Sequence, residues 1–278
     1  MPTFAGMEQR DKFKGVESIK FYSRFTDDAS CLEYLSSIKR ADGFKCKKCG
    51  HTNYCNDRYP YSRRCTRCKY DESVTSGSMF DKIKFPLVYA FHIAFKISTK
   101  KKGMSSLELA EEYCMRQKTV WEFKRKIQKA MRSSGNYPLK GEVHVDEFYI
   151  GGEEEGIIGR STEGKKKLVI VALEIVRDGV GRAYAQVIDD ASASSFRPFF
   201  DRYISKDAKV ITDEWSGYLP LKKDYPKLEQ RPSDKGKGHP QIHTHIMNIK
   251  GWLRGIHHHC SKEHLQGYLD EYHFRFNR

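Results

Sequence analysis

The hydrophobic pattern is most regular between residues 142 and 152, where the chain reads EVHVDEFYIGG. Val143 and Val145 fall on one face of an extended chain, and His144 and Asp146 fall on the other. β-Branched and aromatic residues that alternate in this way and end in Gly-Gly predict a strand. An acidic side chain on an inward face costs several kcal/mol, roughly, unless a partner neutralises it. Taken alone, this pattern is equally consistent with an edge strand whose aspartate faces water.

A second stretch of the chain repeats the arrangement. In KVITDEW, residues 209–215, the apolar pair Val210-Ile211 leads to Asp213, and a glutamate follows it as one follows Asp146. Two strands that each present an aspartate at a strand end indicate one shared cation site. Hard oxygen ligands of this kind suit Mg²⁺ or Mn²⁺.

The other elements of the second half predict a mixed α/β (α+β) domain. They are an apolar strand, a strand paired with it as a hairpin across Asp178-Gly179, a short helix and two C-terminal helical segments: residues 167–176, 182–188, 194–203, 243–255 and 261–276. The chain therefore supplies three antiparallel strands, a helix, a further strand that ends at Asp213, and closing helices.

The first half of the chain has helical periods instead. Residues 1–26 show no clear period and predict a loose lead-in. Asp27 or Asp28 caps a short helix that ends near Gly43. Three further helices are predicted, the first of them apolar nearly all round and therefore buried: residues 85–97, 107–115 and 119–132.

The last two of these helices are joined by a short turn, and the second one is strongly basic. Its lysines and arginines favour a helix-turn-helix that contacts DNA; they are Lys118, Lys124, Arg125, Lys126 and Lys129. An ordinary helical hairpin with a solvated basic face has the same pattern. The neighbouring cysteine-rich segment favours DNA binding.

That segment carries two CxxC pairs, Cys46-x-x-Cys49 and Cys65-x-x-Cys68. Their spacing is typical of a four-thiolate structural zinc site, one Zn²⁺ in a zinc ribbon. Basic and aromatic residues surround the second pair, as expected of a nucleic-acid contact; the arginines are Arg63, Arg64 and Arg67. Zinc ribbons also bind proteins, so the motif alone does not decide the partner.

Charge divides the chain sharply. The net charge is +14, and residues 1–140 carry 29 Lys and Arg against 15 Asp and Glu, whereas residues 141–278 carry 21 of each. A basic module joined to a neutral one suggests that the first half holds a polyanion and the second does something else. No apolar run approaches the length of a membrane span and no signal peptide opens the chain, so the expected location is the cytoplasm, with no membrane partner.

A third ligand for the acidic site should come from the helix after residue 243. Asn248, 35 positions beyond Asp213, and His245 are the candidates, and Glu147 or Glu214 could assist. Lys250 and Arg254 could hold a phosphate nearby. Phosphodiester cleavage and strand transfer use this kind of site, because two divalent ions can activate the attacking oxygen and stabilise the leaving one.

These residues resemble the zinc-ribbon insertion-sequence transposases of the DDE superfamily. The resemblance runs from about Asp27 to Arg278, and its most specific pieces are VDEFYIGG, TDEWSGY and YLDEYHFRFNR. It implies a ribonuclease H-like catalytic core in which Asp146 and Asp213 are the first two catalytic metal ligands. The third, usually acidic, position falls on Asn248, as in some branches of the family, and the zinc cysteines match the four named above.

The resemblance implies the following organisation and activity. Residues 1–26 lead in; 27–80 hold a helix and the zinc ribbon; 81–140 bind DNA through the helix-turn-helix; 141–278 form the catalytic domain. The protein would bind the terminal inverted repeats of an insertion sequence, with water and then a freed 3′-hydroxyl as nucleophiles and no covalent protein intermediate. A homodimer or larger assembly on nucleoid DNA is expected.

Two alternatives remain open. A transposase-derived regulator that binds DNA without catalysis would keep the cysteines and the basic helices, but it has no use for paired acidic strand ends. A stand-alone nuclease would cut DNA without joining it. An asparagine at the third position removes one negative charge, and its amide oxygen is a weaker ligand for Mg²⁺.

Overall fold

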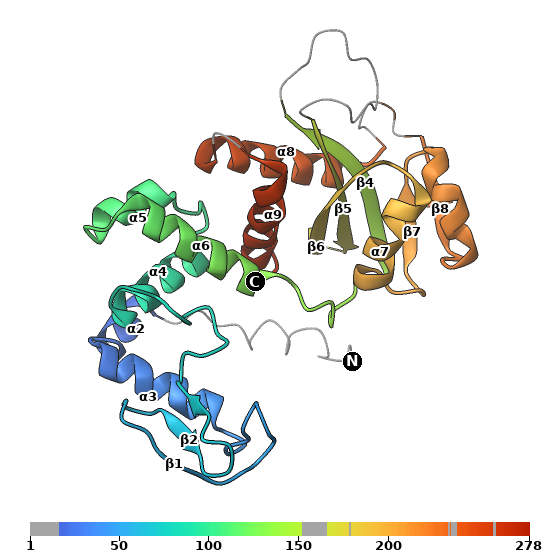
Figure 1. The fold of residues 1–278 in the computed structure, drawn as a ribbon. Helices are drawn as coiled ribbons and strands as arrows, with labels where there is room; N and C mark the ends of the chain where they lie inside the picture. Colours follow the sequence, from blue (N-terminus) through green and yellow to red (C-terminus); the bar gives the residue numbers. More distant parts are fainter. Residues whose placement is uncertain (1–16, 152–165, 178, 233, 235–237, 258–259) are drawn as a thin grey trace, which may run out of the picture. The chain divides into compact units, whose positions relative to one another are not determined.

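The computed structural model describes residues 17–151, 166–177, 179–232, 234, 238–257 and 260–278 (Figure 1). The chain divides into two compact units, one made of residues 1–100 and 106–130 and the other of residues 101–105 and 131–278. The predicted loop at 153–164 and Asp178 of the predicted hairpin turn lie outside the described residues. In the described part of the chain, no helix is both long enough and apolar enough to cross a membrane.

In the described part of the first unit, one helix was not predicted from the sequence. α2 (Ser18–Arg24) lies inside the stretch predicted to be a loose lead-in. Phe21 stacks on Phe95 with ring centroids 4.0 Å apart, and Phe25 packs on Phe91 at 4.9 Å. The prediction was wrong here because a seven-residue helix is too short to show a period, whereas tertiary aromatic contacts stabilise it.

The other helices of this unit agree with the sequence pattern. α3 (Asp28–Lys39) is capped by Asp27, whose carboxylate accepts a hydrogen bond from the Ser30 N–H at 2.8 Å. α4 (Leu87–Thr99) follows Pro86 and buries its apolar face. α5 (Ser106–Glu112) and α6 (Gln117–Met131) are separated by four residues. A small antiparallel sheet completes the unit: β1 (Tyr54–Asn56), β2 (Arg63–Cys65) and β3 (Asp71–Glu72).

The second unit is built on a five-stranded mixed sheet. In chain order the strands are β4 (Glu142–Ile150), β5 (Lys167–Val176), β6 (Gly179–Ile188), β7 (Lys209–Thr212) and β8 (Leu228–Gln230). Their order across the sheet is β6-β5-β4-β7-β8. β5 is antiparallel to both of its neighbours, β4 and β6, whereas β7 lies parallel to β4 and β8 parallel to β7. This is the ribonuclease H-like arrangement, and the predicted fold class is confirmed.

Helices cover both faces of this sheet, as Figure 1 shows. α7 (Ala193–Tyr203) and the 3₁₀ helix η1 (Ser216–Lys223) pack on one face, against Val143, Val145 and the same-facing residues of β5. α8 (Pro240–Ile256) and α9 (Lys262–Phe276) pack on the other, against Phe148 and the alternate residues of β5. A strand buried on both faces explains why β5 reads as a continuous apolar run.

A buried histidine pair joins α8 to α9. His245 and His273 approach at 3.2 Å between their Nε2 atoms, and the His273 Nδ1–H donates to the Leu269 carbonyl at 2.8 Å. Both side chains are buried, and burial lowers the pKa of His245 to about 3 and that of His273 to about 4. Because neutral His273 carries its proton on Nδ1, its Nε2 accepts a hydrogen bond from the Nε2–H of His245.

The low pKa values of this pair predict that acid will destabilise the contact between α8 and α9. The folded-state pKa values lie below the usual 6.5, so the unfolded chain takes up protons first as the pH falls. The free energy of unfolding therefore decreases from about pH 6.5 toward pH 3, by up to about 1.4 kcal/mol per pH unit for each histidine. Asp270 acts in the opposite direction, since burial raises its pKa to about 6. Hydrogen exchange of α8 and α9 across this range should show a shallower slope in His245→Gln. An equal slope in His245→Gln and the parent would contradict the assignment, and His51→Gln in the other unit is the control.

Candidate active site

The strand register brings the two predicted aspartates together. β4 and β7 run parallel, and the paired residues are Glu142 with Lys209, Val143 with Val210 and His144 with Ile211. Continuing this register by two residues places Asp213 beside Asp146. Neighbouring strands lie about 4.8 Å apart, so the two carboxylates start from adjacent backbone positions.

Both aspartates also project from the same face of the sheet. Side chains alternate along a strand, so Asp146 shares a face with Phe148, which packs in the core under α8 and α9. Val210 faces the opposite core, so Ile211 and Asp213 face the α8 side. Helix α8 packs on this same face of the sheet.

Backbone hydrogen bonds orient each carboxylate. Oδ1 of Asp146 accepts from the Glu147 N–H at 2.8 Å, and Oδ1 of Asp213 accepts from the Trp215 N–H at 3.1 Å. Gln230 on β8 donates to the backbone carbonyls of Asp213 and Trp215 at 3.2 and 2.9 Å. The turn after β7 is thereby held from the neighbouring strand.

Glu147 occupies the other face of the sheet, where a buried tyrosine holds it. The Tyr218 hydroxyl donates to Oε2 of Glu147 at 2.6 Å, and the Tyr218 ring stacks on Phe196 at 4.5 Å. Burial raises the pKa of Tyr218 well above its usual value, and the negative charges of Glu147, Asp146 and Asp213 raise it further. Tyr218 therefore remains a hydrogen-bond donor at neutral pH.

Removing that hydroxyl should destabilise the second unit measurably. In Tyr218→Phe the Glu147 carboxylate loses a buried donor, and we expect a loss of about 1–3 kcal/mol. Thermal unfolding with hydrogen exchange of β4 measures it. Tyr137→Phe, whose side chain is 52% exposed, is the matched control and should stay within about 0.5 kcal/mol. A Tyr218→Phe protein as stable as this control would contradict a stabilising role for the hydrogen bond from Tyr218 to Glu147.

Helix α8 brings His243 close to Asp146. His243 Nδ1 lies 3.8 Å from Oδ2 of Asp146. Lys250 is seven residues further on and falls on the same flank; its Nζ lies 5.4 Å from the centre of the Phe148 ring. Burial lowers the pKa of Lys250, and Asp146 opposes this shift. Arg254 follows one turn later, and its Nε donates to the Lys250 carbonyl.

The two predicted third ligands are placed elsewhere on α8. Asn248 is exposed and lies five residues from His243, which turns it about 140° around the helix axis. His245 is buried against His273, between α8 and α9. By helix geometry, Asn248 therefore lies on a different flank of α8 from His243, and His245 faces α9. Of the assisting glutamates, Glu147 binds Tyr218 on the other face and Glu214 is exposed.

The sequence did not identify His243 as a neighbour of Asp146, or the hydrogen bond from Tyr218 to Glu147. A seven-residue spacing between His243 and Lys250, two full helical turns, was the available signal for the α8 flank. Trp252, one turn after Asn248, packs on Tyr272 of α9, and its Nε1–H donates to the Lys102 carbonyl at 3.0 Å. Tyr218 lies in a 3₁₀ helix that has no clear sequence period.

The chemistry of these donors fits a hard divalent cation. Two carboxylates share one face, a third lies behind the sheet, and all three contribute to the negative potential at Tyr218. Among the described residues, the group of three or more metal-ligand side chains whose ligand atoms all lie within 4.8 Å of one another is the cysteine cluster described below. Asp146, Asp213 and His243 do not form such a group.

The sequence of this unit matches the family described as the ISXO2-like transposase domain, over residues 138–277. The chain belongs to this family of DDE transposases. The match contains the complete sheet, both aspartates and helices α7 to α9. It begins after the cysteine-rich segment and the basic helices, so the first unit of this ISXO2-like transposase lies outside it.

Two other comparisons add little to this assignment. No curated protein matched the transposase. Among solved structures, one titled a crystal structure of a pre-cleavage Mos1 transpososome aligns with 66% of this chain and 73% of its own chain, at 13% identity and a TM-score of 0.30. A likeness this low carries no weight for the function.

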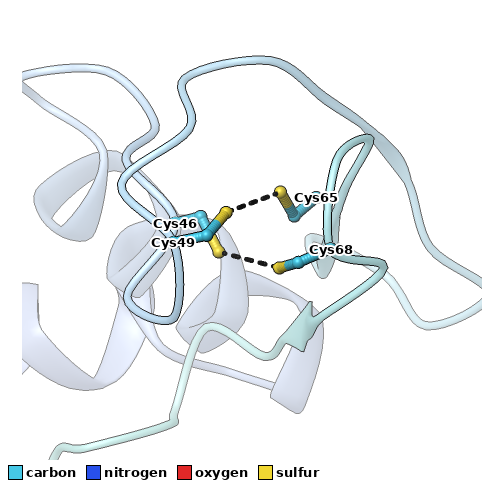
Figure 2. A group of neighbouring side chains, drawn as sticks. All are labelled: Cys46, Cys49, Cys65 and Cys68. Carbon is cyan, nitrogen blue, oxygen red and sulfur yellow. Dashed lines mark hydrogen bonds between the residues drawn. The ribbon is translucent and has the colours of Figure 1, made fainter.

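The cysteines of the first unit form a closed four-sulfur cluster (Figure 2). Cys46 and Cys68 lie 3.6 Å apart between sulfurs, as do Cys49 and Cys65. Four ligands at about 2.3 Å around a tetrahedral zinc ion would be separated by about 3.8 Å, so the spacing fits. Hydrogen bonding from the Cys68 backbone N–H lowers the pKa of Cys65 to about 7, whereas burial and the neighbouring thiols raise that of Cys68 to about 12.

Two equivalent backbone turns position these sulfurs. The Cys46 N–H donates to the His51 carbonyl and the Gly50 N–H to the Cys46 carbonyl, at 2.8 Å each. Cys65 repeats this pattern with Tyr70 and Lys69, at 3.0 Å each. Gly50 and Lys69 occupy the same place in the two turns with φ of +72° and +57°, the left-handed conformation that such a turn requires.

The predicted DNA-contacting residues divide by exposure. Arg64, Arg67, Lys118 and Lys129 are exposed, and Arg125 is partly exposed on the same stripe of α6 as Lys118 and Lys129. Arg63 lies over the Tyr54 ring at 3.8 Å, and Lys126 donates to the Asp81 carbonyl at 2.5 Å. Lys124 is only 2% exposed, so its predicted contact with DNA is wrong: it belongs to the inner side of α6, next to Phe123 and Ile127 in the helical period.

Proposed function

We propose that this transposase cleaves DNA at the ends of an insertion sequence and joins those ends to target DNA, in a reaction that depends on Mg²⁺ or Mn²⁺. The observation that supports the proposal is the parallel β4–β7 register, which pairs His144 with Ile211 two residues before Asp146 and Asp213. Neither a binding module nor a structural protein needs two carboxylates on adjacent inner strands of a sheet, where their mutual repulsion opposes folding.

In this proposal Asp146 and Asp213 hold up to two divalent cations. A cation held there would supply activation of an attacking water or 3′-hydroxyl and charge stabilisation of the departing 3′-oxygen of DNA. The backbone N–H groups of Glu147 and Trp215 fix the orientation of the two carboxylates. Tyr218 stabilises β4 from the opposite face of the sheet through its hydrogen bond to Glu147. Lys250 and Arg254, on the flank of α8 that faces Asp146, would hold phosphate groups beside the reacting one.

The first unit would hold the terminal inverted repeats. Structural zinc on Cys46, Cys49, Cys65 and Cys68 would fix the ribbon, whose arginines lie beside exposed tyrosines, as with Arg63 over Tyr54. Lys118, Arg125 and Lys129 form the basic stripe of α6, and α5 and α6 would act as the helix-turn-helix. Reaction at two transposon ends at once would require a dimer or larger assembly on DNA.

The experiment that tests this function uses the full chain with DNA that carries the terminal repeats of its own insertion sequence. Cut ends and joined products should form with Mg²⁺ or Mn²⁺ and not with EDTA. Supplying a pre-cut end separates the classes, since a transposase joins it to target DNA whereas a nuclease does not. Tight binding to the repeats without products in either metal would indicate a transposase-derived regulator and reject the proposal.

A further inference from the structure

We infer that a pocket between α3 and the ribbon hairpin holds one backbone phosphate of the terminal-repeat DNA, through Arg40, Arg58 and Arg63. This inference deepens the proposed function and rests on it, because that function makes DNA the ligand of the first unit. The pocket lies within that unit, where the C-terminal end of α3 meets the loop that joins β1 to β2.

The pocket has a volume of about 430 Å³ and a positive lining. Its three arginines face a single carboxylate, that of Asp57, which leaves an excess of two positive charges. Oδ1 of Asp57 accepts a hydrogen bond from the Arg58 N–H at 2.7 Å. Tyr59 and Tyr61, which also line the pocket, are 61% and 41% exposed, so the pocket opens to solvent. A lining of this charge attracts an anionic group.

Arg40 has an unused pair of hydrogen-bond donors. Its Nη1 donates to the Ser36 hydroxyl at 3.0 Å, but its Nε and Nη2 are buried and have no hydrogen-bond partner in the described part of the chain. Buried donors without a partner destabilise the free protein. Nε and Nη2 form one edge of the guanidinium, and the two parallel N–H bonds of such an edge match two oxygens of a phosphate. A phosphate reaches this edge once the side chain rotates toward the pocket that it lines.

The charges around Arg40 do not neutralise it. Burial lowers the pKa of Arg40, and the positive charge of Arg63 lowers it further. Glu72 opposes this shift, but it is already paired twice. Its Oε1 lies 3.2 Å from Nζ of Lys47 and 3.5 Å from Nζ of Lys39. Two like charges close together repel one another, and an anion held between Arg40 and Arg63 removes that repulsion.

The alternation of β2 directs its two arginines to opposite sides of the ribbon. Arg63 lines the pocket with its guanidinium 3.8 Å above the Tyr54 ring, whereas Arg64 pairs with Asp71 of β3 at 3.4 Å. The Tyr54 ring packs on Phe44 at 5.2 Å, and Phe44 belongs to the small core of the cysteine cluster. The ribbon core therefore holds Arg63 in the pocket wall, and the inferred phosphate lies on the Arg63 side of the ribbon.

The tip of the hairpin places an aromatic side chain on a strained backbone. Tyr61 has a φ of +60°, the left-handed conformation that glycine adopts without strain. Its side chain is nevertheless exposed, so burial in a core does not offset the strain. An exposed tyrosine on a strained backbone indicates a function other than folding. At the mouth of a positive pocket, it can pack on the deoxyribose next to the bound phosphate.

Binding of the zinc-loaded full chain to DNA with its terminal repeats, measured at several salt concentrations, tests the pocket. Arg40→Met keeps an unbranched side chain and removes its charge. We expect about 10-fold weaker binding and a decrease of about 1 in the slope of log binding constant against log salt, the loss of one phosphate contact. Arg24→Met is the matched control, because the Arg24 guanidinium lies 4.7 Å above the Tyr34 ring and outside the pocket. It should bind within about twofold of wild type.

Repeat DNAs in which one phosphate at a time is replaced by a neutral methylphosphonate locate the contact. Wild type should lose about 10-fold in affinity at one phosphate, and Arg40→Met should lose nothing further there, because that phosphate and Arg40 act as a pair. Arg58→Met changes an exposed side chain and should reduce the same penalty. Zinc content and hydrogen exchange of α3 and the ribbon should match wild type in both variants.

Different results separate this inference from the function on which it rests. If wild type does not prefer the terminal repeats to other DNA, the proposed role of the first unit and the pocket fail together. If the repeats are bound and Arg40→Met and Arg58→Met keep every methylphosphonate penalty, the pocket is rejected and the function stands. Equal weakening by Arg40→Met and Arg24→Met would indicate only a general electrostatic attraction and would also reject the pocket. If Arg40→Met loses the exchange protection of the ribbon, the result with Arg58→Met decides.

Discussion

Asp146→Asn and Asp213→Asn will each lower the rate of DNA end cleavage and of strand transfer by about 10³-fold or more. Each change replaces a charged oxygen ligand by a neutral one at a site where the cation provides most of the charge stabilisation of the reacting phosphate. The two losses should not add in the double variant, because a site without either carboxylate already fails to hold the ion.

The matched control is Asp207→Asn, an exposed aspartate in the turn that precedes β7. It removes the same charge from the same part of the chain and should leave both rates within about twofold of wild type. Binding to the terminal repeats should be unchanged in all three variants, since the aspartates do not belong to the DNA-holding unit. Retention of cleavage by either Asp146→Asn or Asp213→Asn would end the proposal that they share one site.

Removing zinc will unfold the ribbon and weaken binding to the terminal repeats by about 10-fold or more. The ribbon has a three-stranded sheet of very short strands and a small core of Phe44 and cysteine side chains, so the metal must supply its stability. Structural zinc contributes an apparent 10–16 kcal/mol, roughly, in small zinc domains. Cys49→Ser or Cys65→Ser should lose the single zinc ion and the exchange protection of the ribbon.

Cys55→Ser provides the comparison, because Cys55 is an exposed cysteine on β1 outside the four-sulfur cluster. It should retain one zinc per chain, the protected ribbon and full DNA binding. Elemental analysis, hydrogen exchange and a binding titration at fixed salt measure the three properties. A chain that holds no zinc and still keeps its ribbon protected would contradict a structural metal site.

Strong periodic patterns in the sequence predicted most of the second unit correctly. The alternation at 142–150 and the apolar run at 167–176 became β4 and β5. Asp213 follows β7 as predicted, but Asp146 lies in the middle of β4 and not at a strand end, because the strand continues past it in its pairing with β5. Short elements without a period were missed, namely α2, η1 and β8, because contacts distant in sequence stabilise them. The CxxC spacing predicted the cysteine cluster, since four thiols on two tight turns have few other arrangements.

The side of a helix that faces a site was harder to predict. Asn248 was chosen by its distance from Asp213 along the chain, but the rotation of α8 depends on which of its apolar residues meet the sheet. His245 could face either the aspartates or α9, and only the packing of His273 decides between them. Lys124 shows the same difficulty, because its charge predicted an outward position that the apolar stripe of α6 does not allow.

The central claim, that Asp146 and Asp213 bind the catalytic cation, is tested most directly by changing the ligand and the metal together. Asp146→Cys and Asp213→Cys place a thiolate at the ligand position, and thiolates accept Mn²⁺ more readily than Mg²⁺. Both variants should be inactive in strand transfer with Mg²⁺ and should recover activity with Mn²⁺, whereas the alanine variants should not recover. Equal activity of the cysteine variants in the two metals, or recovery of the alanine variants with Mn²⁺, would contradict direct binding of the cation by these residues.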